Sequence, residues 1–188
     1  MTANGSWSGK RPTSGMIPRK LETLKGPLTL ARVGHSTKQG APCSHEDNLG
    51  SPWWLSVGTL EYLWGLSRNS GTPLSTLVRQ KCCVPYYWNS SCDLIYEFDL
   101  VGYLDCWIGP GTFFFPEKNQ AAPAPSATSP LWPAGDVVFF PAGEFPQIFI
   151  PGAWDKSVRQ LAWSNARVMD INDAAKVASY LAIPRIKV

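Results

Sequence analysis

Short apolar runs that end at proline or glycine constrain the fold of this chain more than any other feature of its sequence. The clearest run is Gln147-Ile148-Phe149-Ile150, which Pro151 and Gly152 close. Proline cannot donate to a strand ladder, so such a run predicts a short strand with a sharp end. Because the 188 residues include 17 Pro and 16 Gly, we expect many short elements joined by loops.

The predicted elements show no regular alternation of strand and helix. One helix is expected over residues 59–66, capped at Ser56 or Thr59, and one over residues 174–181, capped by Asp173. Gly109-Pro110-Gly111 predicts a sharp turn. The expected strands cover residues 27–34, 52–56, 94–101, 113–115, 136–140, 147–150, 158–163 and 167–171. This pattern favours an α+β fold with mostly antiparallel strands in two packed sheets and a few short helices.

Composition and length indicate one globular domain. Hydrophobic residues make up 44% and charged residues 16%, and a net charge of +3 does not indicate a broad nucleic-acid-binding face. Residues 1–26 mix Gly, Ser, Thr, Pro and basic side chains, so we expect a flexible basic arm or linker there and a single catalytic-type domain over 27–188.

The start of the chain has no apolar segment of the kind found in signal peptides. No run reaches the roughly 20 apolar residues that span a bilayer, so no membrane partner is expected.

The five cysteines form no CxxC pair, so a structural zinc site is not expected. Cys43, His45 and His35 are the candidates for a ligand cluster, but a polar loop with scattered Cys and His is the commoner explanation. A cysteine protease would need a nucleophile and base in a defined geometry, which Cys43 with His45, or Cys92 with His35, does not by itself indicate. We therefore expect no metal and reduced thiols.

Three positions carry candidate chemistry. Arg32 lies near the end of the first expected strand, and its planar fork of donors suits a phosphate. Ser56 ends a strand that runs directly into a helix, and Gln147 opens the late apolar strand, three residues after Glu144. The neighbouring Trp53 and Trp54 fit core packing, and one of them could instead stack on a flat ligand ring.

This order of features resembles the ADP-ribosyltransferase toxins with an Arg-Ser-Glu signature. Arg32, Ser56 and the stretch from Glu144 to Gly152 stand in the corresponding places. The resemblance is one of layout across residues 27–163. It implies an ADP-ribosyltransferase-like fold and an enzyme that takes NAD as its substrate, breaks the bond between nicotinamide and ribose, and passes through a transition state with positive charge on the sugar.

The resemblance also implies roles for individual residues. Arg32 would hold a phosphate or the ribose end of NAD, and Ser56 would brace the nicotinamide ribose. Trp54 or Tyr62 would pack against the nicotinamide ring. The family's catalytic Glu is replaced here by Gln147, which can bond a ribose hydroxyl but carries no charge.

Three explanations of Gln147 stay open. It is the natural residue of a divergent branch, or Glu144 does the catalytic work from the preceding turn, or the chain is an inactivated variant of a toxic protein. Glu144 and Gln147 are therefore both candidate catalytic residues.

The function that the resemblance implies is an NAD-dependent mono-ADP-ribosyltransferase effector or toxin domain. It would be secreted or injected, would modify a protein or nucleic acid in the cytoplasm of a target cell, and would require an immunity protein in the producing cell. One alternative is an NAD glycohydrolase toxin that uses water as acceptor. Another is a non-enzymatic binding domain whose Trp and Tyr side chains form an exposed recognition face.

Overall fold

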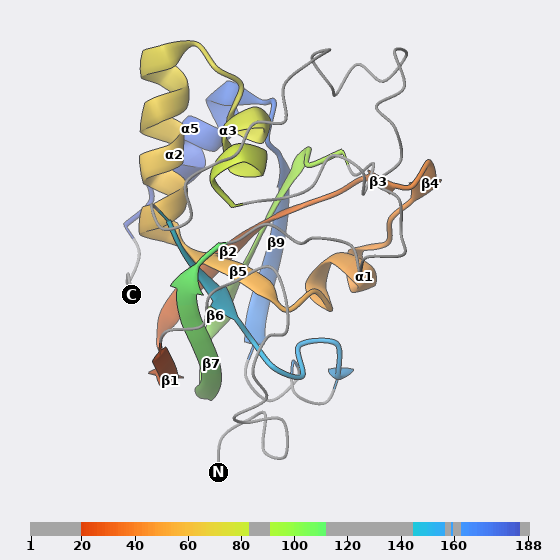
Figure 1. Ribbon diagram of the computed structural model, residues 1–188, viewed down its shortest axis with the longest axis vertical. Coiled ribbons are helices and arrows are strands. Elements are labelled where there is room, and N and C mark those ends of the chain that lie inside the picture. Colours follow the sequence, from red (N-terminus) through yellow and green to blue (C-terminus); the bar gives the residue numbers. More distant parts are fainter. Residues whose placement is uncertain (1–19, 83–90, 112–144, 157–158, 160–162, 185–188) are drawn as a thin grey trace, which may run out of the picture.

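The computed structural model describes residues 20–82, 91–111, 145–156, 159 and 163–184. These residues form a seven-stranded antiparallel sheet, a two-stranded sheet and four helices (Figure 1). The strands are β1 (Lys20–Lys25), β2 (Leu28–Gly34), β3 (Thr37–Lys38), β4 (Ala41–Pro42), β5 (Trp53–Ser56), β6 (Leu94–Leu100), β7 (Tyr103–Pro110), β8 (Pro146–Phe149) and β9 (Trp163–Asp170). The helices are α1 (His45–Leu49), α2 (Val57–Ser70), α3 (Leu74–Lys81) and α5 (Ala174–Leu181).

The strands of the large sheet follow the order β1-β7-β8-β5-β2-β6-β9, and every pair is antiparallel. The α+β class and the antiparallel pairing are therefore confirmed. The prediction of two packed sheets needs correction, because β5 pairs with β8 on one side and with β2 on the other and so joins both groups of strands into one sheet.

One face of this sheet forms the first core. Along β2, Leu28 and Leu30 point to this face because successive side chains alternate, and they join Trp54, Phe98 and Leu104 in one buried cluster. The cluster contains side chains of β1 and β7, near one end of the strand order, and of β6, near the other end. The sheet must therefore curve strongly, so that this face closes on itself.

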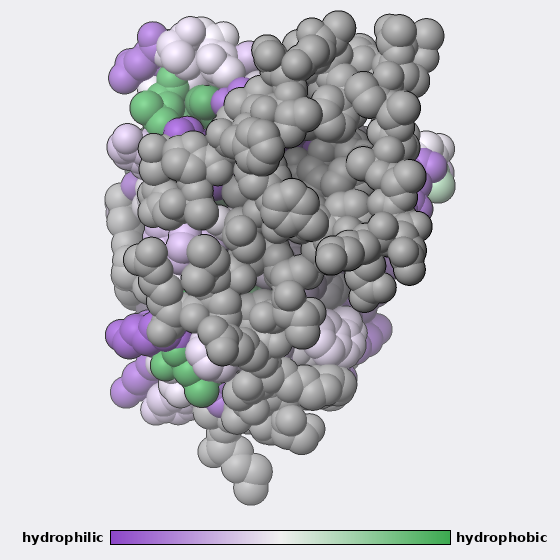
Figure 2. All heavy atoms as spheres, viewed as in Figure 1, coloured by the Kyte–Doolittle hydropathy of each residue, from purple (hydrophilic) through white to green (hydrophobic). Residues whose placement is uncertain are grey.

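The opposite face packs against α2, α3 and α5, which lie together at one end of the molecule, while β1 and β7 lie at the other (Figure 1). Ala31 of β2 and Ile95 of β6 meet apolar side chains of the three helices here. On the view in Figure 2, the described hydrophobic side chains form small separate spots, one over α2 and one beside β1 and β7, with hydrophilic residues around them. None of the described helices has the length and apolar character needed to cross a membrane.

Local sequence signals predicted several elements well. The expected strands at 27–34, 52–56, 94–101 and 147–150 are β2, β5, β6 and β8, and α5 begins directly after Asp173, whose side chain accepts a bond from the Lys176 amide at 3.0 Å. Helix α2 is longer than predicted and ends at Gly71, whose φ of 72° glycine adopts readily.

Other predictions differ from the structure. The expected turn at 109–111 is wrong, because Gly109 and Pro110 continue β7 and pair with Gln147 and Pro146 of β8. Residues 167–170 belong to the single strand β9 rather than to a separate short strand. Residues 20–25, at the end of the expected arm, pair with β7. The strands expected at 113–115 and 136–140 lie outside the described residues.

Candidate functional site

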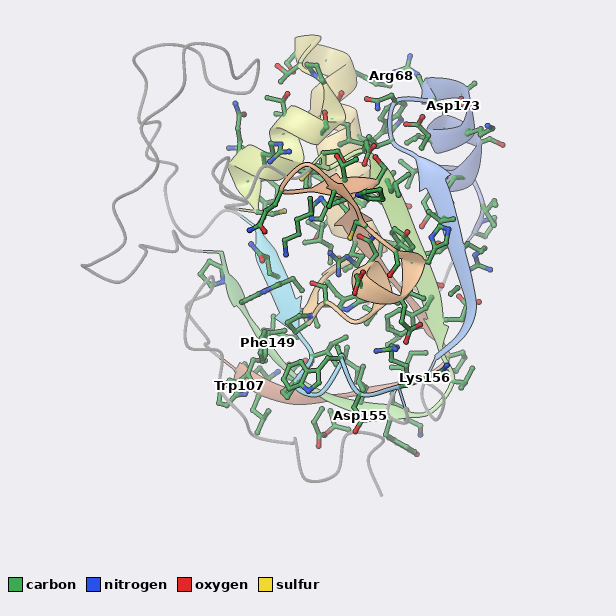
Figure 3. The ribbon with its side chains drawn as sticks, turned by 90° about the vertical axis from the view of Figure 1, so that its right-hand side faces the viewer. Arg68, Trp107, Phe149, Asp155, Lys156 and Asp173 are labelled. Atoms are coloured by element: carbon green, nitrogen blue, oxygen red, sulfur yellow. The ribbon has the colours of Figure 1, made fainter. Side chains whose placement is uncertain are left out.

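A cavity of ≈ 760 Å³ lies where β2 and β5 stop pairing. β2 pairs with β6 at all seven of its positions but with β5 only at Leu30 and Ala31. The residues just beyond on the two strands, Arg32 of β2 and Trp54 of β5 among them, line the cavity. The lining also includes residues of α1, the β3–β4 hairpin, α3, β8, the segment after β8 and the loops on either side of α1. Figure 3 turns the side of the molecule that carries α1 and the hairpin toward the reader.

Arg32 is a buried cation in this lining, with 6% of its surface exposed. It follows Leu28 and Leu30 on the same face of β2, so the strand carries its guanidinium from the apolar core into the cavity. Nη1 donates to the Asn48 carbonyl, Nη2 makes a long contact of 3.5 Å to the Val33 carbonyl, and Nε has no partner. Among the described residues, no carboxylate pairs with Arg32.

The electrostatics of Arg32 follow from this burial. Loss of hydration lowers the pKa of the guanidinium to about 10. The Trp54 ring, whose centroid lies 5.7 Å from Cζ, offers a π face, which is a weaker partner than an anion. The group stays charged at neutral pH, so the cavity holds an incompletely compensated positive charge.

Asn48 fixes the geometry around Arg32. Its side chain accepts from the His35 amide at 2.9 Å and donates to the His35 carbonyl at 2.8 Å, as a neighbouring strand would. Its own backbone carbonyl is the Arg32 acceptor. A Cβ on Gly34 would lie 2.6 Å from Asn48 Oδ1, so only glycine lets α1 approach β2 this closely. The amide therefore joins α1 to the end of β2.

His35 is buried beside Arg32 and is neutral. The Cys92 amide donates to its Nδ1 at 3.2 Å, so the proton of the ring lies on Nε2. Burial, with a smaller contribution from the nearby Arg32 charge, lowers the pKa of His35 to about 4. His35 is also one of the residues that line the cavity.

The two tryptophans of β5 have different positions. Trp54 is 1% exposed, its ring packs edge-on against Phe98 with centroids 4.6 Å apart, and its Nε1 donates to the Ser51 carbonyl at 2.9 Å. It is therefore mainly a core residue that reaches the cavity wall. Trp53 is partly exposed on the other face of β5 and makes an edge contact with Phe149, which lies beside Trp107 in Figure 3. Trp53 and the more exposed Trp154 are therefore the lining rings with free area for stacking.

Gln147 also lines the cavity, but its side chain leaves β8 on the face opposite to Arg32. Trp54 shares a face with both Ile148 and Arg32, and Gln147 precedes Ile148 by one residue. Its Nε2 donates to the Cys82 carbonyl at the end of α3 at 2.7 Å. A Cβ on Gly111 would lie 2.2 Å from this Nε2, so any larger residue there would displace the Gln147 amide from its present position. The amide therefore joins β8 to α3.

Of the remaining predicted site residues, Ser56 and Tyr62 do not line the cavity, and Glu144 lies outside the residues that the structure describes. Ser56 caps α2 by accepting a bond from the Thr59 amide at 3.1 Å. Tyr62 is 57% exposed on α2, with its ring centroid 5.5 Å from that of Phe145. The structure thus brings together Arg32, Trp54 and Gln147 of the predicted set.

A second buried arginine contributes to the lining. Arg159 is 7% exposed, its Nη1 donates to the Ala153 carbonyl at 2.7 Å, and its Nη2 pairs with Glu46 of α1. Burial lowers its pKa. No sequence signal marked Arg159, Asn48 or Glu46, because each owes its position to contacts between distant segments.

The candidate metal ligands have other partners. Cys43 Sγ accepts from the side-chain amide of Asn48, and His45 Nδ1 lies 2.6 Å from the Tyr96 hydroxyl. His35 Nδ1 accepts from the backbone amide of Cys92. In the described part of the chain, no three His, Cys, Asp or Glu side chains gather as a metal site requires.

Comparisons with protein-family models, with curated proteins and with solved structures each found no match. The geometry of the cavity therefore carries the functional argument.

Proposed function

We propose that the cavity binds NAD and that the chain is a mono-ADP-ribosyltransferase domain of an effector or toxin, acting on a protein or nucleic acid of a target cell. One observation carries this proposal. Arg32 is a buried guanidinium with an unpartnered Nε and no described carboxylate partner, and it opens into a cavity that aromatic side chains line.

A phosphate group of NAD would compensate the buried charge of Arg32. Burying an unpaired cation is costly, and an anion that enters the cavity offsets that cost through charge-assisted bonds. The vacant Nε and the weakly engaged Nη2 form the edge of the guanidinium that matches two phosphate oxygens. A cavity of ≈ 760 Å³ has the size of a cofactor site, and Trp53 offers a ring on which a nicotinamide or adenine can stack.

The catalytic carboxylate of the proposed reaction is a separate question. Cleavage at the ribose builds positive charge, which a nearby carboxylate stabilises. Among the described lining residues the carboxylates are Glu46, which pairs with Arg159, and Asp47, which accepts from Ser44. Gln147 contributes no charge, so Glu144 stays the candidate for this role, and Gln147→Glu tests the alternative that this copy is inactive.

The alternatives have less support. A recognition face of exposed aromatics is not indicated by Tyr62, Tyr103 and Trp154, which are the strongly exposed aromatic side chains in the described ranges and belong to three different segments. An NAD glycohydrolase would use the same cavity, and the acceptor assay below distinguishes it.

The test is an NAD titration by calorimetry with the chain, Arg32→Met and Arg68→Met. Arg68 is exposed in the last turn of α2 and provides a control with the same change of side chain. We expect Arg68→Met to bind like the parent chain and Arg32→Met to bind at least about tenfold more weakly, because it loses a charge-assisted phosphate contact. Absence of NAD binding, or equal binding by both variants, would overturn the proposal.

An assay of NAD turnover distinguishes an ADP-ribosyltransferase from an NAD glycohydrolase. Nicotinamide release from NAD, measured with and without a mixture of target-cell proteins and RNA, shows whether an acceptor other than water is used. We expect transfer of labelled ADP-ribose to a macromolecule, from the chain itself or from Gln147→Glu. Nicotinamide release with no labelled acceptor would favour the glycohydrolase.

A further inference from the structure

Two buried guanidinium groups reach the same end of α1. Nη1 of Arg32 donates to the Asn48 carbonyl, and Nη1 of Arg159 lies 3.5 Å from the position that a Cβ of Gly50 would take. Asn48 and Gly50 are two residues apart, so the two cations lie on neighbouring parts of one wall of the cavity. Arg32 comes from β2 and Arg159 from the segment after β8, and no local motif would unite them.

The two guanidiniums differ in how their charge is compensated. Arg32 has no described anionic partner, whereas Arg159 pairs with Glu46. The two members of that pair are held very differently, since the exposed fraction is 8% for the Arg159 side chain and 60% for that of Glu46. Arg159 is also anchored by its bond to the Ala153 carbonyl. Glu46 can therefore rotate into water while Arg159 stays in position.

We propose that Glu46 occupies the place of a ligand phosphate on Arg159, and that the diphosphate of the ligand displaces it to bind Arg32 and Arg159 together. This inference rests on the proposed function and adds to it a second arginine and an internal competitor. A diphosphate linkage matches this arrangement, because once Glu46 has left each of its two phosphates can contact one guanidinium. The site thus favours a diphosphate over a single phosphate group.

The neighbouring Asp47 provides a matched control. It also lines the cavity, but its carboxylate accepts from the hydroxyl of Ser44 at 2.7 Å, at the start of α1, and it makes no described pair with Arg159. Glu46→Gln and Asp47→Asn each remove one negative charge from the same short helix. Only Glu46→Gln removes the competitor from Arg159.

The experiment measures the affinities of NAD and AMP for the parent chain, Glu46→Gln and Asp47→Asn by calorimetry at one fixed salt concentration. We expect Glu46→Gln to bind NAD about 2- to 5-fold more tightly, which is the upper part of the range for releasing a partly exposed ion pair, and Asp47→Asn to change the affinity less than about twofold. We expect AMP, with one phosphate, to gain less than NAD from Glu46→Gln.

The outcomes distinguish this inference from the proposed function. Equal gains for Glu46→Gln and Asp47→Asn, or equal gains for NAD and AMP, would overturn the exchange of Glu46 for phosphate while NAD binding through Arg32 stands. Weaker NAD binding by Glu46→Gln would also overturn it. If none of the three proteins binds NAD although circular dichroism shows that they are folded, the proposed function itself is wrong.

Discussion

The proposed role of Arg32 in anion binding carries a cost in stability for the free protein. A buried cation with no described carboxylate partner lowers stability, and apolar side chains of similar volume often serve a fold better. We predict that Arg32→Met raises the free energy of unfolding by about 1–2 kcal/mol while it removes NAD binding. Urea denaturation of the two chains checks the first half.

Arg167 provides the contrast for this prediction. Its guanidinium pairs with Glu97, which is 1% exposed, and with Asp99 at 3.0 Å. Arg167→Met removes the charged partner of the buried Glu97 carboxylate, which also accepts from the Tyr180 hydroxyl, so we expect a loss of about 1–3 kcal/mol. If Arg32→Met destabilises the fold as much as Arg167→Met, Arg32 is a structural residue and its role as an anion ligand is wrong.

His35 makes the stability of the chain depend on pH. Burial and the Arg32 charge hold its pKa at about 4 in the folded chain, against 6.5 when it is free. Between these values the unfolded chain binds a proton that the folded chain does not, so stability falls as the pH drops through this window. We predict that His35→Gln, whose side-chain oxygen can still accept from the Cys92 amide, flattens this dependence.

Urea midpoints measured from about pH 7 to about pH 4 test this prediction. His45→Gln is the control, since His45 is exposed and leaves His35 unchanged. Depressed pKa values of Asp93 and Asp47 also remove stability in acid, but below the usual carboxyl range. A slope that is the same in His35→Gln and in the control would refute the assignment to His35.

At the level of elements, Ser56 shows how a helix cap can resemble a ligand-binding residue. It ends β5, and its hydroxyl accepts from the Thr59 amide at the start of α2. We predict that Ser56→Ala costs about 1 kcal/mol of stability through the lost cap and leaves NAD affinity unchanged. Ser56→Asp, which preserves an acceptor, should restore the stability. Weaker NAD binding with unchanged stability would instead give Ser56 the cofactor-binding role.

The elements differ in how well local sequence predicted them. Helix α5 was predictable because Asp173 caps it, alanines favour it and Pro184 follows it. Strand β7 was not, because Gly109 and Pro110 indicate a turn, whereas in the structure they pair with Gln147 and Pro146 of β8. Helix α1 lies in a segment rich in loop-forming residues, and its position depends on the contact of Asn48 with His35.

The same reasoning explains what could be predicted of the site. Arg32 follows from its position at the end of a strand and its chemistry, both of which are local. The contacts of the site are not local, since Asn48 lies 16 residues from Arg32 and Glu46 lies 113 residues from Arg159. No sequence pattern states that β2 and β5 pair only at Leu30 and Ala31, and this short pairing creates the cavity.

For the whole molecule, α1 and α5 differ in their position relative to the cavity, and ligand binding should show this difference. Helix α1 lines the cavity, whereas α5 packs on the other face of the sheet. Both helices are short, so some of their amides exchange with solvent by local opening, which a ligand suppresses only where it is bound. We predict that NAD slows local exchange in α1 and at the end of β2, and leaves it unchanged in α5.

Amides that exchange only by global unfolding, expected in the fully paired β2–β6 region, provide an internal scale for this measurement. They should gain about 2.7 kcal/mol of protection at 100 times the Kd, because a ligand of the native state stabilises the whole fold by mass action. Arg32→Met should show neither effect, since it lacks the phosphate contact. Slowing of local exchange in α5 but not in α1 would mean that NAD binds elsewhere, and the cavity between β2 and β5 would then not be the binding site.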